Sequence, residues 1–98
     1  MGNQTSILET STIGLHVLKN KNVGNGLQAF FDFITHVDGI RLNAEIELLS
    51  QKVKDNVGRP LNLIVYSSKT QKLRNVNIIP THSGIGVSVA VFTLNLGL

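Results

Sequence analysis

The side chains that most often carry catalysis or bind metals are few in this sequence and lie far apart. Three histidines are present, His16, His36 and His82, without the spacing of a metal site, and there is no cysteine. The chain also lacks the phosphate-binding loop, the serine nucleophile elbow and the zinc-protease motif. We therefore expect no enzyme activity, no metal site and no cofactor.

The first residues carry a motif that predicts a covalent modification. Met1-Gly2-Asn3-Gln4-Thr5-Ser6 fits the pattern M-G-x-x-x-[ST], in which removal of Met1 exposes Gly2 for N-myristoylation. The pattern is short and often matches by chance, so the residues alone leave the modification open. One myristoyl chain binds membranes only marginally, so a second signal is needed, from a cationic surface or a membrane-bound partner.

A glycine-containing loop near the C-terminus could bind a peptide. Small residues surround one apolar side chain in Ser83-Gly84-Ile85-Gly86-Val87-Ser88. Such a loop can turn backbone N–H groups inward to hold a terminal carboxylate, while the strand that follows pairs with the bound peptide. The same glycines also suit an ordinary hairpin loop, and the residues alone favour that simpler interpretation.

Charge is distributed unevenly along the chain. All six acidic residues lie within the first 55 positions, and the remainder carries four cations and no acid: Arg59, Lys69, Lys72 and Arg74. These cations could attract lipid headgroups or nucleic acid, although solvated side chains on a hairpin are the simpler interpretation. Nucleic-acid binding would also call for aromatic rings beside the cations, and only Tyr66 is suitably placed.

The chain is predicted to fold as one small domain, whose helix and strands position the candidate residues described above. The 98 residues, 42% hydrophobic and 15% charged, predict one globular unit over 13–98 behind a flexible arm at 1–12. We expect strands at 14–19, 61–66 and 73–79, a final strand opening from a loop within 84–94, and two short strands within 27–42 that turn at Asp38-Gly39. A helix over 44–55, with Asn43 as its N-cap, buries a stripe of Ile46, Leu49 and Val53. The order predicts an α+β fold, a partly open antiparallel barrel capped by one main helix.

Several segments together resemble the first PDZ-like domain of the Golgi reassembly and stacking proteins, the GRASP family. The resemblance runs in register from about residue 14 to 92. It is carried by Phe30-Phe31-Asp32-Phe33-Ile34, Arg41-Leu42-Asn43, Asn56-Val57-Gly58-Arg59-Pro60-Leu61, Val65-Tyr66-Ser67-Ser68-Lys69-Thr70 and Gly86-Val87-Ser88-Val89.

This resemblance implies a PDZ fold with the circularly permuted strand order of bacterial PDZ domains. The peptide groove would then be lined by a strand near the end of the chain. Ile85, Gly86 and Val87 would form the carboxylate-binding loop, and Ser88 and Val89 would begin the strand that pairs with the ligand. Leu49 and Val53 would supply the wall on the helix.

The resemblance also implies a function. GRASP-family proteins are myristoylated at Gly2 and tether Golgi membranes by self-association, so we expect this chain at the cytoplasmic face of the Golgi. Their partners include golgins and the tails of transmembrane cargo, and they take part in unconventional secretion. On this basis the chain is a non-enzymatic tethering and scaffolding module with no nucleic-acid partner.

The sequence departs from the family pattern at three points. The segment between Pro80 and Gly86 is about five residues shorter, which leaves groove shape and ligand preference open. Phe92 stands where better-known members carry cysteine, so a metal site shared between His16 and a partner is not expected. The family carries a second PDZ-like domain and a Ser/Pro-rich tail, whereas this sequence covers one domain.

Two alternatives remain open at this stage. The chain could be the regulatory peptide-binding module of a protease, or a soluble adaptor that carries no lipid. Separately, the final residues Leu96-Gly97-Leu98 have the apolar-x-apolar pattern of one class of PDZ ligand, so one chain's end could fill the groove of the next.

Overall fold

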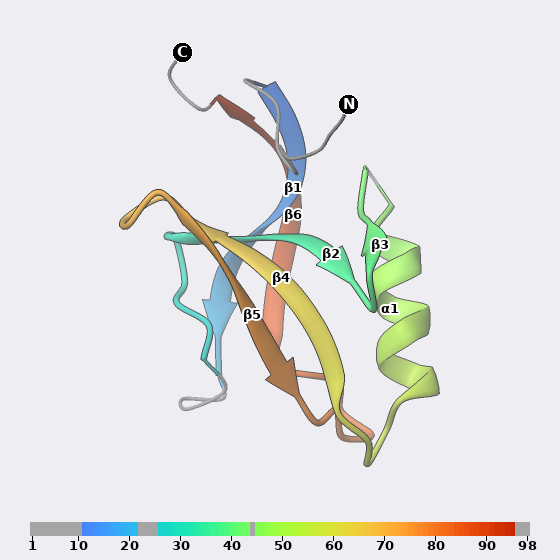
Figure 1. Cartoon of the computed structure of the whole chain (residues 1–98). Coiled ribbons are helices and arrows are strands. Elements are labelled where there is room, and N and C mark those ends of the chain that lie inside the picture. Colours follow the sequence, from blue (N-terminus) through green and yellow to red (C-terminus); the bar gives the residue numbers. More distant parts are fainter. Residues whose placement is uncertain (1–10, 22–25, 44, 96–98) are drawn as a thin grey trace.

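A computed structural model describes residues 11–21, 26–43 and 45–95, which form one helix and six strands (Figure 1). The elements are β1 (Ser11–Asn20), β2 (Asp32–Val37), β3 (Ile40–Arg41), α1 (Ile46–Asp55), β4 (Leu61–Ser67), β5 (Lys72–Ile78) and β6 (Val87–Asn95). The expected α+β class is confirmed, with the helix between the short β2–β3 hairpin and the β4–β5 hairpin.

All strand pairs are antiparallel, and the sheet runs in the order β5-β4-β2-β1-β6, with the short β3 paired to β2. β6 is therefore an edge strand within the part of the chain that the structure describes. It pairs with β1 along nearly its whole length, from Ser11 opposite Asn95 to Asn20 opposite Val87. This pairing brings the two ends of the domain together.

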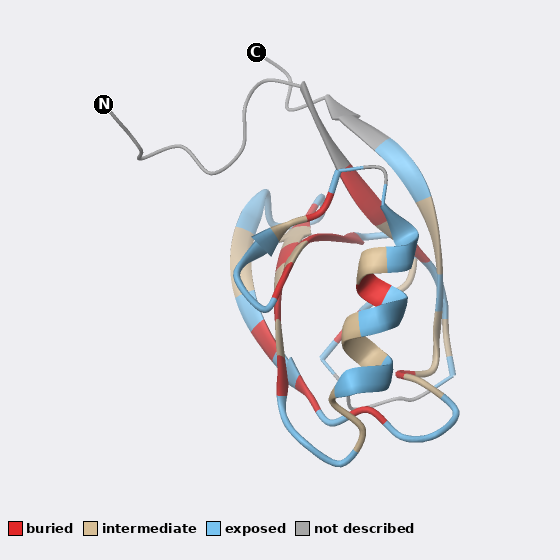
Figure 2. Cartoon of the chain, turned by 90° about the vertical axis from the view of Figure 1, so that its right-hand side faces the viewer, coloured by how far each residue is buried: buried red, intermediate tan, exposed pale blue. Residues whose placement is uncertain are grey.

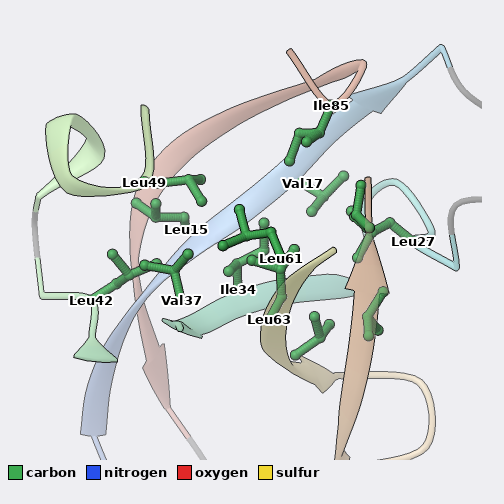
Figure 3. Close-up of a cluster of buried hydrophobic side chains, with 13 residues drawn as sticks. Leu15, Val17, Leu27, Ile34, Val37, Leu42, Leu49, Leu61, Leu63 and Ile85 are labelled. Atoms are coloured by element: carbon green, nitrogen blue, oxygen red, sulfur yellow. The ribbon is translucent and has the colours of Figure 1, made fainter. Parts of the chain in front are cut away.

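The core lies on the concave side of the sheet (Figure 3). Side chains alternate along β4, where Leu61, Leu63 and Val65 are buried and the residues between them are partly exposed, as the two-residue period of a strand requires. Leu15 and Val17 of β1 are fully buried, and Leu49 of the helix packs against the same cluster. These contacts fix α1 against the sheet (Figure 2).

The start of the helix differs from the prediction. α1 begins at Ile46 with Glu45 at the N-cap position, and no side chain caps it. Asn43 is not the cap; instead its carbonyl accepts a hydrogen bond of 3.0 Å from the Glu45 N–H. The helix therefore starts later than the sequence indicated.

Other boundaries also shift. β1 begins at Ser11, inside the range 1–12 that was predicted as the arm, because the pairing with β6 extends that far. β6 begins at Val87, after a loop at 84–86, which agrees with the loop and strand predicted within 84–94. The lipidation motif around Gly2 and the final residues 96–98 lie outside the described residues.

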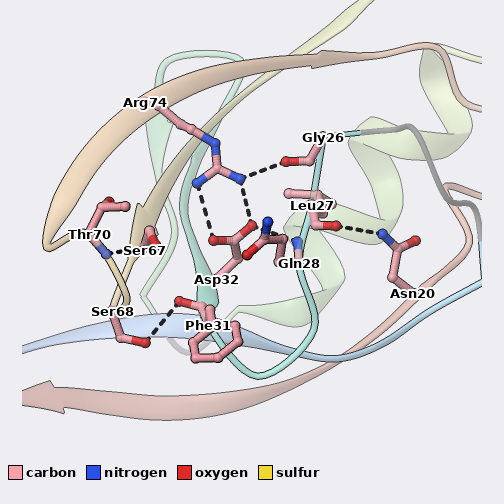
Figure 4. A network of polar contacts seen from close by, with 10 residues as sticks. All are labelled: Asn20, Gly26, Leu27, Gln28, Phe31, Asp32, Ser67, Ser68, Thr70 and Arg74. Carbon is pink, nitrogen blue, oxygen red and sulfur yellow. Dashed lines mark hydrogen bonds and ion pairs between the residues drawn. The ribbon is translucent and has the colours of Figure 1, made fainter.

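A polar network fastens the loop before β2 to β5 (Figure 4). Asp32 is 1% exposed, and its two carboxylate oxygens accept hydrogen bonds of 3.1 and 2.6 Å from Arg74. The same guanidinium donates to the Gly26 carbonyl at 2.6 Å, and the Gln28 N–H donates to Asp32 at 2.7 Å. The segment that leads into β2 is thus held by a buried ion pair.

Candidate functional site

A groove of about 520 Å³ lies between α1 and the edge strand β6. The helix lines one wall, and the loop that precedes β6, together with the first residues of that strand, lines the other. The lining residues are Lys21, Ile46, Leu49, Ser50, Val53, Ser83, Gly84, Ile85, Gly86, Val87, Ser88 and Val89.

The structure brings all the predicted peptide-binding residues to this groove: Leu49, Val53, Ile85, Gly86, Val87, Ser88 and Val89. Their depths differ. Leu49 is 5% exposed and Ile85 is 7% exposed, and both side chains belong to the hydrophobic core (Figure 3). Val53, Val87 and Val89 are half-buried and pack against that core, so they form the apolar surface that a ligand can reach.

The loop at one end of the groove is held by its own backbone. Thr81 and Gly84 exchange hydrogen bonds of 2.9 and 2.8 Å, and the Thr81 hydroxyl also donates to the Gly84 carbonyl. Gly84 and Gly86 have φ angles of +96° and +80°, a region that side chains with a Cβ rarely adopt. The glycines therefore let the chain reverse twice in a short distance, which sets Ile85 into the core between them.

Lys21 joins the loop from the end of β1. Its backbone N–H donates to the Gly86 carbonyl at 2.7 Å, and its exposed side chain lines the groove. The groove thus has a cation at the loop end. Sequence reasoning missed Lys21 because only the antiparallel pairing of β1 with β6 brings it beside Gly86.

The helix wall also contains two residues that the prediction left out, Ile46 and Ser50. Together with the predicted Val53 they occur at i, i+4 and i+7, the spacing of one helix face. The predicted buried stripe of Ile46, Leu49 and Val53 is wrong at Ile46, which is 37% exposed. The sequence alone does not reveal which apolar positions of the helix stay exposed.

A second cavity of about 440 Å³ adjoins the groove and shares Ser50, Val53, Ser83 and Gly84 with it. It continues past the end of the helix, where it is lined by Lys54, Val57, Thr81 and His82. The shortened segment between Pro80 and Gly86 therefore borders both cavities.

The histidines lie apart in the fold. The His16 ring stacks on Phe33 with centroids 4.3 Å apart, tilts against Phe92 at 5.5 Å, and has Nε2 2.8 Å from the Phe30 carbonyl oxygen. Within residues 11–21, 26–43 and 45–95, no three His, Cys, Asp or Glu side chains form a group that could hold a metal ion. Burial lowers the pKa of His36, and the neighbouring charge of Arg41 lowers it further.

Three of the four cations in the later half have partners within the fold. Arg74 is committed to Asp32, Arg59 donates to the Asp55 carbonyl at the end of α1, and Lys69 lies over the Phe31 ring at 5.5 Å. Within the described part of the chain, the helix is too short to cross a bilayer.

Comparison with known proteins gives matches to one family. A model of the GRASP55/65 PDZ-like domain matches residues 5–97. Golgi reassembly-stacking protein 1 of Mus musculus is 40% identical over 57 residues, which cover 58% of this chain and 13% of that protein. The Homo sapiens protein of the same name is 39% identical over 57 residues, with the same coverage. This chain therefore corresponds to a small fraction of the length of the curated relatives it matches.

Proposed function

This chain belongs to the GRASP55/65 PDZ-like domain family, and from that membership we propose that it is a Golgi scaffolding module that binds extended peptides between α1 and β6. The observation that carries the proposal is the groove itself. An apolar trough of about 520 Å³ runs beside a strand whose outer edge is unpaired within the described sheet.

Binding takes place by strand addition. A peptide laid along Val87, Ser88 and Val89 extends the sheet beyond β6, so that main-chain hydrogen bonds supply affinity and alternate side chains face the helix. The helix wall from Ile46 to Val53 is about 10 Å long, from a rise of about 1.5 Å per residue. That length matches about three residues of extended peptide, at about 3.3 Å per residue.

The two ends of the groove favour different parts of a ligand. The loop carrying Gly84 and Gly86, with Lys21 beside it, supplies backbone dipoles and a cation that suit a terminal carboxylate. Val53 and Val87 then face the last side chain, and Ile46, about two turns back along the helix, faces the side chain two positions earlier. We expect apolar residues at both ligand positions.

The strand order supports the assignment to a circularly permuted PDZ domain. In this arrangement the strand that pairs with ligand comes late in the chain, as β6 does, and the helix precedes it. Self-association through the same groove would join copies head to tail.

Tethering requires a membrane anchor, and Gly2 provides it in this proposal. Myristoylation at Gly2 places the domain at the cytoplasmic face of the Golgi, where weak groove contacts with golgin-type or cargo-tail peptides act together. A role in unconventional secretion follows from the same family membership. The module performs no chemistry on its partners.

The groove is tested by selecting from a pool of peptides with random residues and free carboxyl ends. We expect enrichment of apolar residues at the last and third-from-last positions. Ile46→Thr should remove the preference at the third-from-last position alone. Ile40→Thr is the matched control, because Ile40 is also exposed, at 42%, but lies outside the groove. No enrichment, or equal effects of both variants, would refute the proposal.

The anchor is tested separately by intact mass of the protein from eukaryotic cells. The proposal predicts a myristoyl increment and membrane association that are both lost in Gly2→Ala. An unmodified wild-type protein would leave a soluble peptide-binding adaptor as the function.

A further inference from the structure

Two exposed aromatic rings lie at the end of the molecule opposite α1, and a lysine of the adjacent hairpin lies over one of them. Phe30 is 68% exposed and Phe31 is 43% exposed, which is unusual for side chains of this size. Lys69 and Lys72, both exposed, lie on the adjacent β4–β5 hairpin. We call these four residues the aromatic–cationic edge.

The backbone holds both rings in place. The Phe30 N–H donates to the Val17 carbonyl at 2.8 Å, and Phe30 has a φ of +71°. The Phe31 carbonyl accepts hydrogen bonds from the N–H and hydroxyl of Ser68, at 2.8 and 3.1 Å (Figure 4). The rings are therefore presented to the surroundings by a well-anchored turn.

The charge of the aromatic–cationic edge is positive. Lys69 Nζ lies 5.5 Å from the centre of the Phe31 ring. Within residues 26–34 and 64–75 the only acid is Asp32, which is buried and paired with Arg74. The other acids in the described part of the chain belong to the β2–β3 turn and to the segment of α1. These elements lie on the right in Figure 1, whereas the tip of the β4–β5 hairpin lies on the left. The acids are Asp38, Glu45, Glu47 and Asp55.

We propose that the aromatic–cationic edge is a membrane-contact surface for anionic lipid. Aromatic rings insert at the boundary between headgroups and acyl chains, and lysines beside them interact with negative headgroups. The charge complementarity selects an anionic bilayer, and the lipidation motif at Gly2 is a separate feature of the same chain that points to a membrane. The edge supplies the second signal that one myristoyl chain requires.

This contact also orients the domain. Because α1 and the hairpin of Lys69 lie at opposite sides of the fold, a bilayer against the edge leaves the groove facing away from the membrane (Figure 1). The inference does not depend on what the groove binds, and it can be tested on a chain without lipid.

The first experiment uses tryptophan as a reporter, since the chain contains none. Unacylated Phe30→Trp is mixed with vesicles of phosphatidylcholine, with or without phosphatidylserine. We expect a blue shift and quenching by brominated lipid only with phosphatidylserine present. Ile40→Trp, on the β2–β3 hairpin, is the matched control and should show neither change.

The second experiment measures vesicle partitioning by sedimentation. The double variant Lys69→Glu, Lys72→Glu should lower partitioning into phosphatidylserine vesicles more than about tenfold. The reason is that each lost cation weakens binding about fivefold. Phe30→Asn should lower it about tenfold, by loss of an inserted ring, and Asn tolerates the positive φ. Lys54→Glu and Ile40→Asn are the controls for charge and apolarity, and unchanged thermal melting shows that each variant folds.

Several results would overturn the proposal. They are an unshifted Phe30→Trp spectrum, equal losses in the controls, or equal binding to vesicles without phosphatidylserine. Binding of an RNA homopolymer in place of vesicles, with the same variants losing it, would reassign the edge to nucleic acid.

Discussion

Asp32 is an acid that the fold buries almost completely, and its charge is compensated by one residue. Arg74 makes two hydrogen bonds to it while remaining partly exposed itself, with 37% of its side chain accessible. Removing Arg74 leaves a buried carboxylate without its counter-charge and frees the Gly26 carbonyl. Breaking this ion pair should therefore lower the free energy of unfolding by more than the intact pair contributes to it.

We predict that Arg74→Ala lowers the free energy of unfolding by about 3 kcal/mol. Urea denaturation measures the change. Lys72→Ala, two residues away on the same strand but exposed, should change it by about 0.5 kcal/mol or less. Equal effects of the two variants would show that the ion pair does not stabilise the fold.

His36 makes stability depend on pH. Burial and the charge of Arg41 lower its pKa in the folded state below the ordinary value of 6.5. The unfolded chain therefore takes up the proton first, so this contribution is complete above pH 6.5 and declines as the pH falls below it. His36→Gln should show a smaller loss of stability on acidification, measured by urea unfolding above and below that pH. If the free energy of unfolding of His36→Gln falls with pH as steeply as that of the wild type, groups other than His36 cause the pH dependence.

At the scale of elements, the start of α1 shows how a local signal can mislead. Asn43 is a residue type favoured at N-caps, yet Glu45 takes that position and the helix begins at Ile46. We predict that Asn43→Ala changes stability by less than about 0.5 kcal/mol, whereas loss of a true N-cap costs about 1 kcal/mol. Thermal or urea unfolding would decide between these values.

The loop before β6 contributes to the core and also lines the groove. Ile85 is 7% exposed and lies in the core, so its substitution acts on the fold as well as on the groove. Ile85→Ala should cost about 2–4 kcal/mol of unfolding free energy. Val89→Ala, at a half-buried position of β6, should cost less than Ile85→Ala. A smaller cost at Ile85 would show that its side chain serves the groove alone.

Much of the element order could be predicted because local signals agree with the fold. Asp38-Gly39 turns β2 into β3, Pro60 precedes β4, and alternation along β4 matches its burial. What the sequence could not supply is long-range pairing. The register of β1 against β6 extends the first strand to Ser11 and brings Lys21 to Gly86, and no local pattern contains that information.

At the scale of the whole molecule, the fold keeps two surfaces apart. The groove lies between α1 and β6, and the aromatic–cationic edge lies on the hairpin side, with the core between them. The family resemblance located the first surface, because its motif residues follow one another along the loop and β6. The second comes from segments around 30 and 69 that are distant in sequence and meet through the pairing of β2 with β4.

The central claim is that the groove binds the carboxyl end of a peptide. The most direct test is an NMR titration of the ¹⁵N-labelled chain with a peptide from the selection, compared with the same peptide ending in an amide. We predict shifts concentrated at residues 84–89 and along the face of Ile46, Ser50 and Val53, and a large loss of affinity for the amide. Shifts centred elsewhere, or equal binding of both peptides, would contradict the account.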